Sequence, residues 1–150
     1  MKDIFKNVYY IFFPLIMGFI VSLIIRNSIG YSDFVKPPIA PPGFLFPIVW
    51  TILYLLMGIS YYILNKNIVP KNTKIIYYFQ LFVNALWSII FFGLKLKFFA
   101  VLWIILLVLL ITLMISKFYD INKTSAYLNI PYLIWCLFAT YLTIGIYILN

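Results

Sequence analysis

The chain has 150 residues, of which 66% are hydrophobic and 9% charged, and its formal net charge is +8. A soluble fold of this length could not bury so much apolar surface, so the sequence predicts an integral membrane protein. Its Lys and Arg residues are scattered singly between apolar runs. That pattern is typical of anchors at a membrane interface, with the lipid bilayer as partner, and argues against a surface that binds nucleic acid.

Five apolar segments remain once the chain is divided at its charges and turn residues: 8–25, 44–64, 75–93, 98–116 and 126–149. Each approaches the ~20 residues that an α-helix needs to cross a bilayer. The segments are continuously apolar, whereas the strands of a membrane barrel alternate with a period of two. We therefore expect an all-α bundle of five transmembrane helices, forming a single domain over residues 1–150.

The connection between the first two helices, residues 26–43, is the longest and the richest in proline. A long loop on a small bundle is typical of a functional or lid-like segment. Prolines at 37, 38, 41 and 42 cannot donate backbone hydrogen bonds and favour an extended path. We expect a stiff cover joined directly to the second helix.

The distribution of basic residues predicts the orientation in the membrane. Seven lie on one side, at positions 2, 6, 66, 71, 74, 117 and 123, and four on the other, at positions 26, 36, 95 and 97. The positive-inside rule therefore places the amino terminus in the cytoplasm and the carboxyl terminus outside.

The residue types exclude several kinds of chemistry. The chain has no His, its only carboxylate side chains are Asp3, Asp33 and Asp120 at helix ends or connections, and Cys136 is its only cysteine. A carboxylate pair, a His-containing triad and a His or Glu metal site are therefore not expected. We expect no metal and no required cofactor.

Aromatic and amide side chains instead recur at helical spacing on three segments. The stripes are Trp50, Tyr54, Met57 and Tyr61; Gln80, Asn84, Trp87, Ser88 and Phe91; and Trp135, Ala139 and Leu142 or Thr143. They could line a ligand site, or the amides and hydroxyl could simply join helices by hydrogen bonds. The tyrosine pairs at 9–10, 61–62 and 77–78 fit an interfacial belt. Trp50 and Trp135 lie deeper, where an indole N–H seeks a partner or faces a ligand.

The order and spacing of three blocks resemble the TspO/MBR family of tryptophan-rich sensory proteins, also called translocator proteins or peripheral-type benzodiazepine receptors. The blocks are "KPPIAPPGFLFPIVWTILYLLMGIS", "QLFVNALWSIIFFG" and "PYLIWCLFATYL". The resemblance implies a five-helix bundle, often a homodimer, whose pocket is covered by the first loop. It also implies binding of tetrapyrroles such as protoporphyrin IX or haem and of drug-like ligands of the benzodiazepine-receptor type.

Carried over position by position, the resemblance implies a set of ligand-binding residues. They are Pro41, Pro42, Gly43, Trp50, Tyr54, Asn84, Ser88, Trp135, Phe138 and Ala139. The chain departs from the family at Ile39 and Phe44, where tryptophans are usual, and this could weaken ring stacking at the pocket mouth. Tyr147 is not followed by a basic residue, which argues against cholesterol as the native ligand.

Three functions stay open at this point. The leading one is a membrane receptor or carrier that holds a metal-free porphyrin between the indoles of Trp50 and Trp135. The second is an enzyme that degrades the porphyrin in light, with Trp50 and Trp135 as its catalytic candidates. The third is a non-catalytic, stress-sensing scaffold. Abundant residues with AT-rich codons favour a bacterial source, and hence a bacterial plasma membrane.

Overall fold

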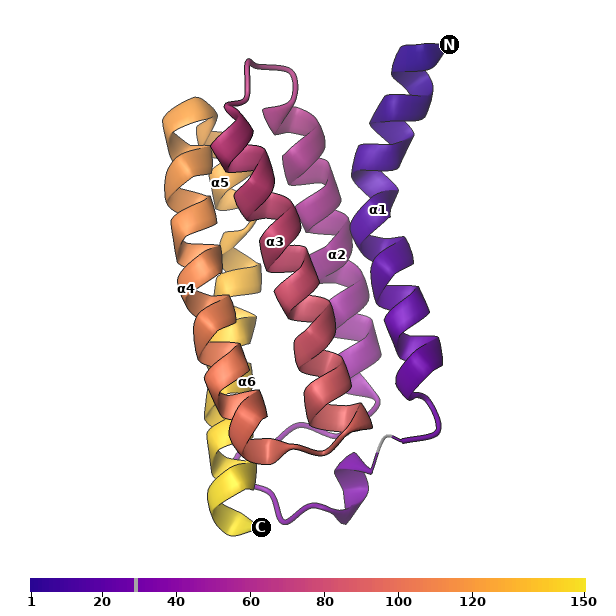
Figure 1. Ribbon diagram of the computed structural model, residues 1–150, viewed down its shortest axis with the longest axis vertical. Helices are drawn as coiled ribbons and strands as arrows, with labels where there is room; N and C mark the ends of the chain where they lie inside the picture. Colours follow the sequence, from indigo (N-terminus) through magenta and orange to yellow (C-terminus); the bar gives the residue numbers. More distant parts are fainter. Residues whose placement is uncertain (29) are drawn as a thin grey trace.

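The computed structural model describes residues 1–28 and 30–150; Ile29, part of the predicted loop 26–43, lies outside the described residues. Among the described residues, five helices are long and apolar enough to cross a membrane, which confirms the predicted all-α architecture (Figure 1). In chain order the elements are α1 Lys2–Ile25, η1 Tyr31–Asp33, α2 Leu45–Leu64, α3 Lys71–Ser88, η2 Ile89–Gly93, α4 Lys97–Ile121, α5 Lys123–Tyr127 and α6 Ile130–Leu149.

Several helices extend beyond the apolar segments from which they were predicted. α1 begins at Lys2 rather than at residue 8, and α4 continues to Ile121 rather than to residue 116. Helical hydrogen bonding does not require apolar side chains, so a helix continues past the hydrocarbon core while its lysines reach the interface. The last segment divides into α5 and α6, and the Asn122 side chain caps α5 by accepting from the amide of Ser125 at 3.0 Å.

The helices are not equally embedded in the bundle. α4 packs on α3 and α6, while α1 stands at one side and packs mainly on α2. α1 is also the least buried of the five spans. The backbones of α1 and α2 approach closely at Gly58, where a Cβ atom would overlap the carbonyl group of Ile11. Only glycine permits that contact, and it fixes the amino-terminal half of α1 against α2.

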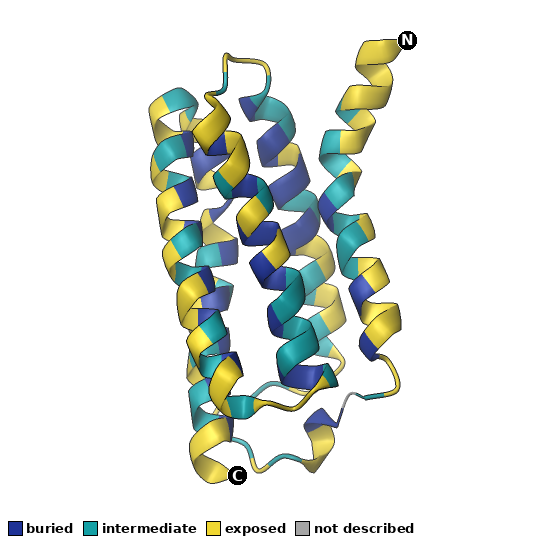
Figure 2. Cartoon of the chain, viewed as in Figure 1, coloured by how far each residue is buried: buried dark blue, intermediate teal, exposed yellow. Residues whose placement is uncertain are grey.

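The helix faces turned toward the middle of the bundle are mostly buried and the outward faces mostly exposed (Figure 2). Many of the exposed residues are large hydrophobic ones, as expected in lipid. Tyr61 and Tyr77 form a parallel stack in this core, with ring centroids 3.9 Å apart and an interplanar angle of 5°. Their exposed fractions are 2% and 1%. The interfacial belt predicted for these two tyrosines was therefore wrong, because the helix phase turns Tyr61 and Tyr77 inward, whereas their neighbours Tyr62 and Tyr78 are only half-buried.

Candidate functional site

A cavity of about 620 Å³ lies between α1 and α2, toward the loop end of the bundle. We call it the α1–α2 cavity. Its described lining residues are Leu15, Ile16, Gly18, Phe19, Val21, Ser22, Ile25, Tyr31, Gly43, Phe46, Pro47, Trp50, Thr51, Tyr54, Ser88 and Phe92. Exposed Ile16, Phe19 and Thr51 stand at its rim. The cavity is therefore apolar, and it opens sideways between two helices toward the region that lipid would occupy.

Trp50 and Tyr54 form the aromatic wall that α2 contributes. Their rings stack with centroids 5.4 Å apart and planes 29° apart. Trp50 also lies 6.4 Å from Trp87 and 6.2 Å from Tyr132, again between ring centroids. A ring with three aromatic neighbours has little freedom to turn, so Trp50 is a fixed part of the cavity wall.

The wall is supported from behind by a buried polar network that joins α2, α3 and α6. The Tyr54 hydroxyl donates to Oδ1 of Asn84 at 2.7 Å, and Nδ2 of Asn84 donates to the Tyr132 hydroxyl at 2.7 Å. Tyr132 donates in turn to Oε1 of Gln80 at 2.8 Å. Each such bond is worth roughly 0.6–1.7 kcal/mol between membrane helices. Two roles were open for these amides: to line a ligand site or to join helices. In the structure, Asn84 and Gln80 join the helices by hydrogen bonds.

The ten residues implied by the family resemblance divide between four places. Gly43, Trp50, Tyr54 and Ser88 line the α1–α2 cavity. Pro41 and Pro42 line a second cavity, formed within the loop, which also reaches Gly43. Asn84 is fully buried behind Tyr54 and is absent from the described lining of either cavity.

The three residues on α6 lie apart from the α1–α2 cavity. Trp135 packs against Phe46 at 5.8 Å and against Phe138 at 5.6 Å, measured between ring centroids. Ala139 borders a void of about 10 Å³, which is too small for a ligand. Phe46 thus stands between Trp135 and the α1–α2 cavity, and the two indoles, Trp50 and Trp135, do not form opposite walls of one site.

Sequence reasoning missed the α1 half of this cavity. Gly18 and Ser22 lie one helical turn apart on α1, and a Cβ atom on Gly18 would overlap the Tyr54 ring. The spacing of two small residues was a readable signal, because small residues four apart mark a helix face that neighbours approach closely. Phe92 was also missed; it lies in η2, a single π-helical turn of the kind often found at functional sites.

The loop crosses the end of the bundle and is fastened to α6 (Figure 1). The Tyr141 hydroxyl donates to the carbonyl of Pro38 at 2.8 Å. Asn150 accepts from the amide of Val35 at 3.0 Å and donates to its carbonyl at 2.8 Å. Pro37 is buried against Gly145, where a Cβ atom would come within 2.6 Å of the proline ring. These contacts hold the loop across the bundle end.

Tyr31 connects the loop with the cavity. Its ring lines the cavity, and its hydroxyl donates to the carbonyl of Pro41 at 2.9 Å. Burial raises the pKa of the Tyr31 phenol, so this group remains a neutral donor at physiological pH. Ile39 and Phe44, the two departures from the family pattern, are 80% and 69% exposed and are absent from the described lining of both cavities.

Fold and site together define an α-helical integral membrane protein with a ligand-sized apolar cavity, closed at one end by a loop. Comparison with known proteins makes the assignment specific. The TspO/MBR family matches residues 10–149. The chain is 38% identical to the tryptophan-rich protein TspO of Archaeoglobus fulgidus, over 99% of both chains. The chain therefore belongs to the TspO/MBR family.

Two further relatives show how widely the similarity extends. The tryptophan-rich protein TspO of Chlorobaculum tepidum is 37% identical, over 80% of this chain and 78% of its own length. The translocator protein homolog of Schizosaccharomyces pombe is 28% identical, over 91% of this chain and 87% of its own length.

Proposed function

We propose that this protein is a membrane receptor or carrier that binds a flat apolar tetrapyrrole, such as protoporphyrin IX, in the α1–α2 cavity. The observation that carries the proposal is a cavity of about 620 Å³ whose inner wall is the ring of Trp50, stacked on Tyr54. Ligand pockets of this kind usually measure ~300–1,000 Å³ and are mostly apolar with a few polar groups. Drug-like aromatic ligands would use the same wall.

The chemistry of the cavity favours binding by burial and stacking. A flat ring against Trp50 would gain roughly 0.5–1.5 kcal/mol from stacking beyond the area that it buries. The polar groups of the lining are chiefly the hydroxyls of Ser22, Thr51 and Ser88, which can orient a ligand. The sideways opening would let an apolar ligand arrive from the bilayer.

A metal-free porphyrin fits better than haem. The chain has no His, and Cys136 is buried on α6, outside the described lining of the cavity. Tyr54 lines the cavity, but its hydroxyl is engaged with Asn84. Axial ligation of iron would therefore have to break that hydrogen bond or use Tyr31, which already bonds to the loop.

Titration of the purified protein with protoporphyrin IX tests the proposal, followed by tryptophan fluorescence and the Soret band. We expect saturable quenching at micromolar ligand. Trp50→Ala should weaken binding about tenfold, which corresponds to ~1.4 kcal/mol. Trp135→Ala serves as the matched control, and it should change affinity much less because Phe46 separates its ring from the cavity. A wild-type protein whose fluorescence is unquenched at micromolar porphyrin would refute the proposal.

Porphyrin breakdown in light, by a mechanism that requires both Trp50 and Trp135, has less support than porphyrin binding. Trp50 packs with Tyr54, Trp87 and Tyr132, whereas Trp135 packs with Phe46 and Phe138. Illumination of the complex would decide it: if Trp135→Phe leaves the loss of the Soret band unchanged, Trp135 has no part in any such reaction. Equal loss in the double Trp→Phe variant would remove the tryptophan mechanism altogether.

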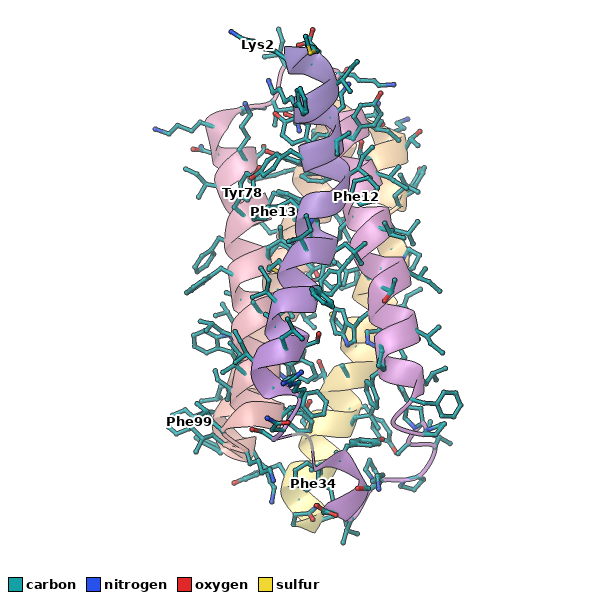
Figure 3. All side chains as sticks on the ribbon, turned by 90° about the vertical axis from the view of Figure 1, so that its right-hand side faces the viewer. Lys2, Phe12, Phe13, Phe34, Tyr78 and Phe99 are labelled. Atoms are coloured by element: carbon teal, nitrogen blue, oxygen red, sulfur yellow. The ribbon has the colours of Figure 1, made fainter. Side chains whose placement is uncertain are left out.

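We also propose that the amino terminus is cytoplasmic. Lys2 lies at the opposite end of the molecule from Phe34 of the loop (Figure 3). The end that carries Lys2 also carries the α2–α3 and α4–α5 connections, so all seven lysines counted for the cytoplasmic side lie together. Labelling of Lys71→Cys in a Cys136→Ala background by an impermeant thiol reagent tests this orientation: the cysteine should not react in intact cells and should react once the cells are opened.

Homodimer formation stays a prediction.

A further inference from the structure

A second cavity, of about 630 Å³, is formed by the proline-rich loop itself, because its described lining residues all lie between Tyr31 and Gly43. We call it the loop cavity. Tyr31 and Gly43 line both this cavity and the α1–α2 cavity, so the two spaces adjoin at these residues. The loop cavity is the more polar of the two, and its lining includes Ser32 and Lys36. A ligand that filled the apolar cavity could therefore extend a polar group past Tyr31 into the loop cavity.

Lys36 is the charged residue that lines the loop cavity in the described part of the chain. Its Nζ lies 3.4 Å from the carbonyl oxygen of Ser32, 3.3 Å from that of Phe34 and 4.9 Å from the ring centroid of Tyr31. These contacts hold the ammonium of Lys36, a half-buried residue, at the cavity wall. All three groups are neutral, so the ammonium keeps its attraction for an anion.

We propose that Lys36 recognises the acidic group of the ligand: the flat ring occupies the α1–α2 cavity, and a carboxylate reaches the loop cavity, where it pairs with the ammonium of Lys36. The inference rests on the proposed function and deepens it by naming the residue that binds the carboxylate. An ammonium and a carboxylate form a charge-assisted hydrogen bond, which is stronger than a bond between neutral groups. The Tyr31 hydroxyl donates its hydrogen bond to the carbonyl of Pro41. In this proposal the carboxylate therefore pairs with Lys36 and not with Tyr31.

The chain offers a matched control for the charge. Lys97 also holds its ammonium over an aromatic ring, with Nζ 5.1 Å from the ring centroid of Phe34. It belongs to the same end of the bundle, but it is absent from the described lining of both cavities. Removal of its charge alters the net charge by the same amount and changes no residue in the described lining of either cavity.

The test compares protoporphyrin IX with its dimethyl ester, which keeps the ring and lacks the ionised carboxylates. Both are titrated into wild type, Lys36→Met, Lys36→Arg and Lys97→Met in neutral detergent. We expect wild type and Lys97→Met to bind the acid about tenfold more tightly than the ester, because only the acid can form the charge-assisted bond. Lys36→Met should bind both ligands as wild type binds the ester, and Lys36→Arg should retain the preference.

The outcomes separate this inference from the proposed function. If Lys36→Met keeps the preference for the acid, or if wild type has none, the carboxylate assignment is wrong while porphyrin binding stands. If neither ligand binds to wild type, the proposed function itself fails. Retention of ester binding by Lys36→Met shows that the variant is folded, so a loss confined to the acid cannot be attributed to misfolding.

Discussion

The hydroxyl of Tyr54 donates a 2.7 Å hydrogen bond to Oδ1 of Asn84, a residue that is itself fully buried. The ring of Tyr54 lines the α1–α2 cavity, while its hydroxyl points away into the polar network of α2, α3 and α6. One side chain thus joins the candidate ligand surface to the rigid centre of the bundle.

Tyr54→Phe should destabilise the protein while leaving the aromatic wall in place. The substitution leaves the carboxamide oxygen of Asn84 without its donor, at a cost of roughly 0.6–1.7 kcal/mol between membrane helices. Thermal unfolding in detergent measures this loss. Tyr127→Phe is the control, because Tyr127 is 59% exposed and lies outside the network. An equal effect of the two substitutions would contradict a special role for the network.

Gly58→Ala should separate α1 from α2. The added methyl group would overlap the backbone carbonyl of Ile11, which cannot move without shifting α1 as a whole. Overpacking of this kind costs about 1–3 kcal/mol. Gly93→Ala is the matched control, since its Cβ would lie 3.4 Å from Ile25, an ordinary contact. Thermal unfolding of both variants, together with porphyrin titration, checks the prediction; indistinguishable melting would show that the α1–α2 contact is not tight.

The double variant Tyr141→Phe with Asn150→Ala should loosen the loop from α6. It removes the hydrogen bonds to Pro38 and to both backbone groups of Val35. Hydrogen exchange of the amides of Val35 and Lys36 should become faster, while the exchange of α4 amides stays unchanged. Unaltered exchange in the loop would mean that the packing of Pro37 on Gly145 is sufficient to hold it.

Ile39→Asn should stabilise the protein. Ile39 has φ 62°, in a turn where the amide of Ala40 bonds to the carbonyl of Pro37. A β-branched residue is strained in this left-handed region, whereas Asn tolerates it. Because the side chain is 80% exposed, little packing is lost. We expect the free energy of unfolding, measured by thermal unfolding, to increase by about 0.5–1 kcal/mol. Ile39→Val retains the branched Cβ and should leave the stability unchanged. If Ile39→Val stabilised the protein as much as Ile39→Asn, backbone strain at this position would not be the cause.

Much of the architecture could be predicted because it is local. In lipid a helix satisfies its own backbone hydrogen bonds, so each apolar segment of sufficient length specifies a span by itself. The polar and aromatic stripes likewise identified inward faces: Met57, Gln80 and Ala139 are all buried. The helix ends were less predictable, since lysines at the interface continue a helix without contributing to its apolar segment.

The sequence by itself determined the five spans, their inward faces and the family, because composition, helical period and motif order are properties of the chain alone. The tertiary structure decided which inward residues border empty space. Trp50 lines a cavity and Trp135 packs against Phe46, although both are tryptophans within apolar helices. The difference arises from the neighbours of each ring: α1 and α2 leave a cavity beside Trp50, whereas Phe46 of α2 packs on Trp135. That geometry depends on contacts between distant segments, which no single helix encodes.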